Sequence, residues 1–539
     1  MRTRAPGLVV IRTDPLRVIF ETRLELTETF DVGGLPVKTK PDASSTSGLA
    51  EAVQAVLPSL TRFLEFSEGD RAVAEQGHWR EALNGSIPEQ GIGRAATLAR
   101  LAESVIPFGV RIGSPGFAGW VTTMPTIVPT VAALSASVAG AQRAWVSAFN
   151  HLEVVALDWL KALLGVPGSY QGVFSSGGSV ANLVGLGAAR QFACERLGID
   201  GSRDGLSGLR QPRVYASNQV HHVVHRAAAV LGLGRRAVTE LPTDATFSLN
   251  AAALRERLRQ DRLNGCTPVA VVASAGTVNT GAIDPLREVA RICRDEQVWL
   301  HIDGAYGAFG ILDPVVMQRY DGFAEADSIA VDPHKWLAVP LGCGATFVRD
   351  GELLGRAFTM ESAEYLEGST RGRQALGSQF EELGYAFHHF GVEQSAQSRG
   401  VTVWAALLEI GLEGMRARVK RHNGFARQVA QATVSSATLE LLAPVVLSIC
   451  CFRYVPQALR GQSGQATLLN ALNKEILRRL HHEQRHIPSS TELNGVLAIR
   501  PCFINPRTTP DDVTGLVESV ERHGAQVWQE HQCGSRPLT

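Results

Sequence analysis

Short, continuously apolar segments that alternate with amphipathic ones constrain the fold of this chain more than any other feature. The stretches "PVAVVASAGT" (residues 268–277), "VWLHID" (298–303) and "SIAVD" (328–332) have the length and composition of buried strands. Strands that are apolar on both faces and separated by helices are typical of a parallel sheet covered by helices on each side. We therefore predict an α/β fold with a mainly parallel sheet.

One of the separating helices is predicted over residues 284–296. Asp284 can cap its amino end, and Pro285 fits its first turn. The apolar residues of this segment recur at the spacing of an amphipathic helix, which predicts that they face the core. They are Leu286, Val289, Ala290 and Cys293.

The chain has 539 residues, which is enough for two or three domains. Residues 39–48 ("TKPDASSTSG") have the composition of a linker. Residues 360–394 are rich in Gly, Arg, Gln and His and lack periodicity, which is typical of an active-site loop, with a disordered surface insertion as the alternative. The predicted parts are an N-terminal extension (1–48), a helical segment (49–125), a large domain (126–404) and a small α/β domain (405–539) with strands at 445–455 and 496–505.

Charge and composition argue against several classes of protein. The formal net charge is zero and there is no dense run of Lys and Arg, so binding to nucleic acid is not expected. Residues 126–141 are the longest weakly polar stretch, but Pro129 and several hydroxyl groups predict a buried helix rather than a membrane span. The eight cysteines are scattered without a CxxC pair, which indicates a reduced, cytoplasmic protein.

Lys335 is the first candidate for chemistry. It lies in "DPHKW" (332–336), directly after a predicted buried strand, in a chain with only six lysines. Apolar surroundings penalise the ammonium form, which suits a lysine to form an imine with an aldehyde. A lysine whose charged end reaches solvent at a strand end is the structural alternative.

Three further elements have complementary chemistry. The glycines and hydroxyls of "SSGGS" (175–179) precede a helix, as in a phosphate-binding turn, although many strand–helix turns are glycine-rich. Asp303 ends an apolar strand, where it can hold a pyridine nitrogen protonated or cap the next turn. His221, His222 and His225 suggest a metal, but there is no HExxH pattern and no cysteine nearby, so we expect no metal and favour a stacking imidazole.

Together these elements are the parts needed to hold pyridoxal 5′-phosphate (PLP). The sequence also resembles the group II PLP-dependent amino-acid decarboxylases, the family of aromatic L-amino-acid and glutamate decarboxylases. The resemblance runs from about residue 117 to residue 507. Its most diagnostic string is "ADSIAVDPHKW" (326–336), and it includes "FSSGGSVANL" (174–183), "SNQVHH" (217–222) and "WLHIDGAYGAF" (299–309).

The resemblance implies PLP fold type I, the aspartate aminotransferase type, and a homodimer with its sites at the subunit interface. It implies that Lys335 forms the internal aldimine, that Asp303 pairs with the pyridinium nitrogen and that His221 stacks on the ring. The implied activity is decarboxylation of an L-amino acid to the amine and CO₂. Further implied site residues are Gly178 and Ser179 at the phosphate, Ala305 on the opposite ring face, Thr277 near the ring hydroxyl, His334 beside the lysine and Thr123 at the substrate edge.

The sequence departs from the family pattern at several positions. Val180 stands where a glutamate usually follows the phosphate-binding serine, and Ala396 and Gln397 replace a usual pair of arginines. Decarboxylating members have a loop tyrosine that protonates the substrate, whereas a phenylalanine there is typical of oxidative aldehyde synthases. Counting back from Trp404 places Phe387 at this position, while Tyr385 lies two residues earlier and is preferred.

Several alternatives remain open at this point. The same scaffold supports oxidative aldehyde synthases and aminotransferases, and the altered arginines allow a PLP-binding homologue without turnover. An unrelated sugar-nucleotide or phosphate-binding α/β protein is a further alternative. The substrate is also open, because Trp120 at the entrance suits an aromatic amino acid, while Arg and His residues in the loop suit an acidic one.

Overall fold

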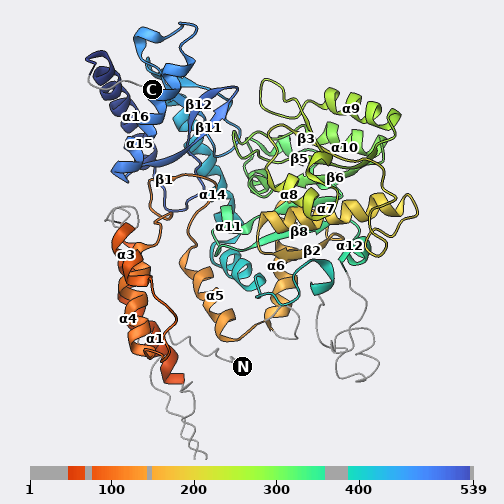
Figure 1. Ribbon diagram of the computed structural model, residues 1–539, viewed down its shortest axis with the longest axis horizontal. Helices are drawn as coiled ribbons and strands as arrows, with labels where there is room; N and C mark the ends of the chain where they lie inside the picture. Colours follow the sequence, from red (N-terminus) through yellow and green to blue (C-terminus); the bar gives the residue numbers. More distant parts are fainter. Residues whose placement is uncertain (1–45, 67–75, 142–147, 359–386, 535–539) are drawn as a thin grey trace, which may run out of the picture. The chain divides into compact units, whose positions relative to one another are not determined.

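The computed structural model describes residues 46–66, 76–141, 148–358 and 387–534 (Figure 1). The chain divides into two compact units, Met1–Ala55 and Val56–Thr539. All that follows concerns the second unit. Its N-terminal part is helical, as predicted, with the helices α1 (Thr46–Leu64, which begins in the first unit), α3 (Gln76–Leu83), α4 (Arg94–Arg100) and α5 (Ile127–Val138).

A seven-stranded sheet forms the centre of this unit, in the order β2-β8-β7-β6-β5-β3-β4. Strand β8 is antiparallel to both of its neighbours, and the other neighbouring pairs are parallel. The predicted α/β fold with a mainly parallel sheet is therefore confirmed. The strands are β2 (Gln171–Ser175), β3 (Pro212–Ser217), β4 (Val238–Leu241), β5 (Thr267–Ser274), β6 (Trp299–Asp303), β7 (Ser328–Val331) and β8 (Gly344–Val348).

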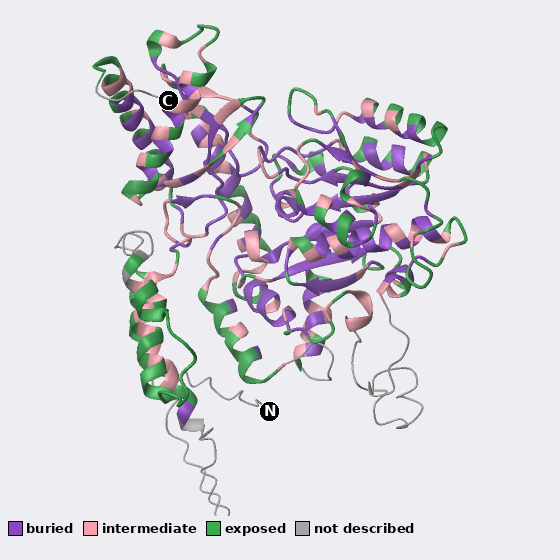
Figure 2. Ribbon diagram, viewed as in Figure 1, coloured by how far each residue is buried: buried purple, intermediate pink, exposed green. Residues whose placement is uncertain are grey.

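Both faces of this sheet are buried, as Figure 2 shows in purple. In β5, Ala270 and Val272 belong to one hydrophobic cluster, and Val271 and Ala273 belong to the other. This alternation explains why β5 is apolar at successive positions from Pro268 to Ala273, because successive side chains point to opposite faces. The covering helices are α6 (Ala148–Leu164), α9 (Ala251–Leu263) and α10 (Leu286–Asp295) in the first cluster and α7 (Gly178–Glu195), α8 (Val223–Val230) and α12 (Gly351–Phe358) in the second.

Helix α10 confirms the predicted core face and corrects the predicted cap. Leu286, Val289 and Cys293 are all buried. Asp284, however, does not cap the helix, because its carboxylate accepts the amides of Ser274 and Leu249, each at 2.7 Å. Complete burial raises the pKa of Asp284 to about 6. The carboxylate therefore ties the end of β5 to the segment before α9.

A five-stranded sheet of order β1-β11-β12-β10-β9 lies in the C-terminal part. The strand predicted over 445–455 is much shorter, and the strand predicted over 496–505 ends early. The domain boundaries at residues 48, 125 and 404 stay predictions. Strand β1 precedes residue 125 in the sequence, yet it pairs with the sheet of the C-terminal part. The elements are β1 (Phe117–Ala118), β9 (Leu439–Leu441), β10 (Phe452–Tyr454), β11 (Ile487–Leu493), β12 (Val496–Arg500), α14 (Gly400–Ser435), α15 (Ala466–Glu483) and α16 (Pro510–Gln532).

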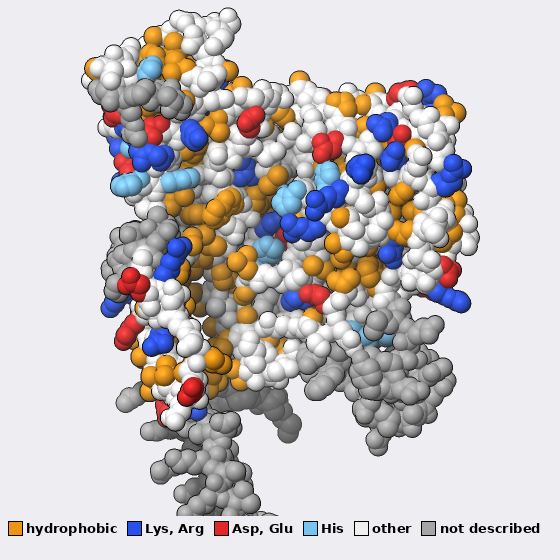
Figure 3. All heavy atoms as spheres, viewed as in Figure 1, with side chains coloured by type: hydrophobic (Ala, Val, Ile, Leu, Met, Phe, Trp, Pro, Cys, Tyr) orange, Lys and Arg blue, Asp and Glu red, His pale blue; other side chains and the backbone are white. Residues whose placement is uncertain are grey.

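The weakly polar segment 126–141 forms a helix, α5, but the prediction that it is buried is wrong. Ile127, Val131 and Val138 are each more than half exposed, and Figure 2 shows most of α5 in green. Figure 3 shows hydrophobic side chains on the surface in this region. Within the described ranges, no helix has both the length and the apolar character needed to cross a bilayer.

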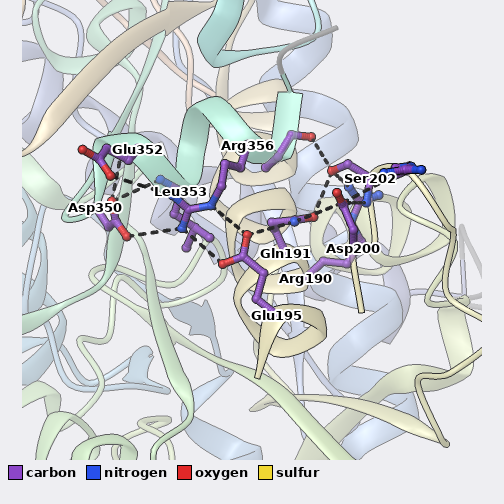
Figure 4. A network of polar contacts seen from close by, with 11 residues as sticks. Arg190, Gln191, Glu195, Asp200, Ser202, Asp350, Glu352, Leu353 and Arg356 are labelled. Carbon is purple, nitrogen blue, oxygen red and sulfur yellow. Dashed lines mark hydrogen bonds and ion pairs between the residues drawn. The ribbon is translucent and has the colours of Figure 1, made fainter. Parts of the chain in front are cut away.

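A polar network fixes the carboxyl end of α7 (Figure 4). Arg356 of α12 donates two hydrogen bonds to Glu195, at 2.8 and 3.1 Å. Gln191 accepts a hydrogen bond from Ser202 at 2.9 Å, which ties the following loop to the same helix. At the amino end of the same helix, the Asn182 side chain donates a hydrogen bond to the Gly178 carbonyl, so polar contacts are present at both ends of α7.

Candidate active site

A cavity of about 790 Å³ lies where the strands of the large sheet end. In register, Ser274 at the end of β5 pairs with Asp303 at the end of β6, and Asp303 pairs with Ala330 of β7. Carboxyl ends of parallel strands are the usual ligand-binding edge of an open α/β sheet. Most of the predicted site residues line this cavity: Trp120, Gly178, Ser179, His221, Thr277, Asp303, Ala305, His334 and Lys335.

Lys335 lies on the short helix α11 (Pro333–Trp336), directly after β7. Its Nζ atom is 2.9 Å from Oδ2 of Asp332, and Trp336 and Leu337 beside it are fully buried. The lysine therefore combines an apolar setting with one acidic partner. The sequence interpretation did not include Asp332, although its position at a strand end was the signal that pointed to Asp303.

The predicted phosphate-binding turn joins β2 to the amino end of α7. Gly177 has a φ of 125°, a conformation that favours glycine. A Cβ atom on Gly178 would lie 2.6 Å from Oδ2 of Asp332 and 3.1 Å from Cβ of Ala305, so the turn has no room for a larger residue there. The free amides and positive dipole end of a helix amino terminus suit a phosphate.

A buried chain of hydrogen bonds holds this turn in place. The indole of Trp299 donates to the Ser328 hydroxyl at 2.8 Å, and that hydroxyl is 2.8 Å from Nδ1 of His301. Nε2 of His301 is 2.9 Å from the side-chain oxygen of Asn182, whose amide nitrogen donates to the Gly178 carbonyl at 2.8 Å. Burial lowers the pKa of His301 to about 4, so its imidazole is neutral near pH 7.

Asp303 at the end of β6 and His221 in the segment after β3 both line the cavity. Oδ1 of Asp303 accepts the Ala305 amide at 3.1 Å, so the carboxylate also has the turn-capping role that was its structural alternative. Nδ1 of His221 accepts the Val223 amide at 3.3 Å, and burial lowers the pKa of this histidine. Helix α8 begins at Val223, so His221 and His225 do not share a helical face as their spacing suggested.

Four other predicted residues have different outcomes. His334 lies on the cavity wall and donates from Nδ1 to the Cys343 carbonyl at 2.8 Å. Thr277 is buried on the wall, with its hydroxyl 3.0 Å from that of Thr280. Thr123 is fully buried, and the structure does not place it among the residues that line the cavity. Tyr385 lies outside the described residues.

Arg500 is a cavity residue that the sequence interpretation missed. It is only 3% exposed, and it donates to the carbonyls of Asn279 and Trp120, each at 3.1 Å, and to the Val278 carbonyl. It also donates to the Ser489 hydroxyl at 3.0 Å. An arginine in the middle of a predicted apolar strand was the available signal. The hydrogen bonds of Arg500 join the two sheets at the entrance of the cavity. The exposed Trp120 lies beside them and has a φ of 49°.

These residues fit PLP. The cavity has an amine for the aldehyde, a glycine turn at a helix amino end for the phosphate and a strand-end carboxylate for the ring nitrogen. The close approach of Asp332 and Ala305 to Gly178 shows that even one added methyl group would not fit in this turn. The cavity could therefore hold a cofactor that has an aldehyde, a phosphate and a ring nitrogen.

The structure gives the contacts or burial of the residues that depart from the family pattern. Gln397 donates to the Ser137 hydroxyl of α5 at 3.1 Å, and Ala396 is buried. Val180 lines the cavity. Phe387 is 1% exposed and belongs to the main hydrophobic cluster, so it does not face the cavity.

The chain is similar to known proteins over most of its length. Residues 79–455 match the family model described as "Pyridoxal-dependent decarboxylase conserved domain". An aromatic-L-amino-acid decarboxylase of Bacillus atrophaeus is 32% identical, over 84% of this chain and 90% of that protein. The fold is similar to that of Oryza sativa TDC, crystallised with PLP and tryptamine (TM-score 0.81, 23% identity, 90% of this chain and 99% of that one). It is also similar to that of Rhodiola rosea 4-hydroxyphenylacetaldehyde synthase (TM-score 0.78, 20% identity, 90% of this chain and 99% of that one).

Proposed function

The chain belongs to the pyridoxal-dependent decarboxylase family, and we propose that it converts an aromatic L-amino acid to the corresponding amine and CO₂ in the cavity of Lys335. It is a PLP-dependent carboxy-lyase. The observation that carries the proposal is the convergence of Lys335, Asp303, His221 and the glycine turn on one cavity. All four come from segments that follow different strands, so their convergence is a property of the fold.

Each residue has a distinct role in this proposal. When bound, PLP supplies a conjugated ring that accepts the electron pair left as CO₂ departs. Asp303 holds a proton on the ring nitrogen, which stabilises the charge that develops. His221 packs against the ring as a neutral imidazole, in agreement with its lowered pKa. Lys335 provides the amine that holds the aldehyde carbon between turnovers.

The proton that replaces CO₂ on the substrate Cα is assigned to Tyr385. Its competitor from the sequence was Phe387, and the burial of Phe387 in the main hydrophobic cluster supports the tyrosine. Oxidative decarboxylation to an aldehyde is the second candidate, because an aldehyde synthase shares this fold. Product analysis separates the two, since one gives amine and CO₂ and the other gives aldehyde, ammonia and peroxide.

The aromatic substrate class is supported by the entrance to the cavity. Trp120 is 63% exposed at the rim and Leu341 is equally exposed, while Val121 and Val180 line the wall. An apolar rim of this kind suits an aromatic side chain. The Bacillus relative, which acts on aromatic L-amino acids by its name, agrees with this choice.

A homodimer in the cytoplasm completes the proposal. The exposed apolar side chains of α5, and Leu408 and Leu412 on α14, form a surface that a second copy would cover. All eight cysteines are free thiols, as expected in a reducing compartment. Val131→Asp on α5 should convert the dimer to monomer in sedimentation, and a wild-type protein that sediments as a monomer would refute the dimer.

The function is tested with full-length protein purified in the presence of PLP. We expect CO₂ release from an aromatic L-amino acid when the common amino acids are screened. Borohydride reduction followed by peptide mapping should place the cofactor on Lys335. A label on another side chain, or protein without bound cofactor, would overturn the proposal, and bound cofactor without any turnover would favour a non-catalytic homologue.

A further inference from the structure

Asp332 is a charged cavity residue to which the proposed function gives no role. Its side chain is 2% exposed, and Oδ2 is 2.9 Å from Nζ of Lys335. Oδ1 makes no hydrogen bond to any residue that the structure describes. A buried carboxylate oxygen without a partner is costly unless a bound group or a proton satisfies it.

The same carboxylate also borders the phosphate-binding turn. A Cβ atom on Gly178 would lie 2.6 Å from Oδ2 and 3.2 Å from Cγ of Asp332. Asp332 therefore lies between the amine of Lys335 and the amino end of α7. Its negative charge stabilises an ammonium on one side and opposes a phosphate on the other.

We propose that Asp332 is a positioning residue for cofactor loading: it is the counter-ion of the free Lys335 amine, and it slows attachment of the cofactor because this buried ion pair must open first. The inference rests on the proposed attachment of the cofactor at Lys335. Oδ2 of Asp332 holds the amine nitrogen at 2.9 Å, and this contact must break before the nitrogen can attack an aldehyde. The ion pair would also reform each time the lysine is released during turnover.

Other titratable groups face this ion pair from four neighbouring segments. Nε2 of His334 is 3.8 Å from Oδ2 of Asp332. His221, in the segment after β3, interacts electrostatically with both members of the pair and with Asp303 at the end of β6. Burial raises the pKa of the Cys343 and Cys502 thiols, so both are neutral near pH 7. Asp332 is the one described carboxylate in salt-bridge contact with Lys335.

The test measures how fast the full-length apo protein attaches PLP, or pyridoxal without the phosphate, from pH 5 to pH 10. The wild type is compared with Asp332→Asn, which keeps the shape and removes the charge. We expect attachment to the asparagine variant to be about tenfold faster near pH 7, because the amine is no longer held in a buried ion pair. The gain should be larger for PLP than for pyridoxal, because only PLP brings a phosphate to the turn.

Asp350→Asn is the matched control, since it removes an equal charge from the network of Figure 4, outside the cavity, and should leave the profile unchanged. Asp332→Ser repeats the test if the asparagine variant does not fold. An unchanged or slower rate of attachment, with the borohydride label still on Lys335, would overturn the role of Asp332 alone. A label found elsewhere would overturn the proposed function together with this inference.

Discussion

Nε2 of His301 lies 2.9 Å from the side-chain oxygen of Asn182, and this contact joins the centre of the large sheet to the phosphate-binding end of α7. Its direction is fixed by Asn182. The amide nitrogen of Asn182 donates to the Gly178 carbonyl, so its side-chain oxygen faces His301 and can only accept. His301 therefore carries its proton on Nε2 and donates to Asn182, and its Nδ1 accepts from the Ser328 hydroxyl.

Replacing His301 by leucine should weaken both the fold and the hold on the cofactor. The substitution leaves Asn182 and Ser328 with unpaired buried groups, at a cost of about 1–3 kcal/mol each. We expect a lower midpoint of urea unfolding and faster loss of PLP on dilution, with little change in the affinity for pyridoxal. Equal losses for PLP and pyridoxal would show that the chain of bonds does not act on the phosphate turn.

His301 also predicts a pH dependence of stability. Its pKa in the folded protein is about 4, below its ordinary value, so the unfolded chain takes up the proton first as the pH falls. This contribution is complete above about pH 6.5 and is lost as the pH falls through 4, by about 3 kcal/mol in total. Urea titrations from pH 7 to pH 4 measure the slope, and His301→Gln, which does not titrate, should reduce it. An equal slope in both proteins would contradict the assignment.

Lys335→Ala should abolish attachment of the cofactor and turnover, because no other described lysine lines the cavity. The measurements are borohydride labelling and CO₂ release. Lys474→Ala removes a lysine outside the cavity and should behave as the wild type. Activity retained by the Lys335 variant would refute its role.

Asp303→Asn should lower kcat by about two to three orders of magnitude, which corresponds to about 3–4 kcal/mol of lost transition-state stabilisation. The amide cannot hold a proton on the ring nitrogen by charge, although it can still accept the Ala305 amide as the carboxylate does. The turn should therefore survive, with an unchanged unfolding midpoint. A kcat within a few fold of wild type would remove Asp303 from the mechanism.

Tyr385→Phe should shift the products from amine and CO₂ toward aldehyde, ammonia and peroxide, since the proton donor for Cα is lost. Chromatography of the products together with a peroxide assay gives the ratio. Phe387→Ala serves as the comparison: it should destabilise the fold by about 3–5 kcal/mol, because a core ring is removed, without a change in products. If the alanine variant changed the products and the tyrosine variant did not, the two assignments would have to be exchanged.

The sequence was sufficient for those site residues that directly follow a buried strand. Gly178, Asp303 and Lys335 could be found because a polar residue at the end of an apolar run stands out, and because strand ends converge in an α/β fold. Arg500 could not be assigned in this way, since its partners Trp120 and Asn279 are more than 200 residues away in the chain. Contacts of that separation depend on the packing of the two sheets.

The two main errors have similar physical causes. Asp284 has the sequence context of a helix cap, but buried amides of Ser274 and Leu249 compete for its carboxylate. The apolar composition of α5 predicted burial, and a single chain leaves much of that helix exposed. Local sequence patterns indicate which residues need a partner, whereas the identity of the partner is decided by tertiary structure.

The hydrogen bonds from Arg500 to backbone carbonyl oxygens have an evolutionary consequence. Three of its acceptors are carbonyls, which every amino acid supplies, so the side chains at positions 120 and 278 can be exchanged without loss of these bonds. Rim residues can therefore change during evolution, and substrate preference with them, while the backbone at the entrance keeps its conformation.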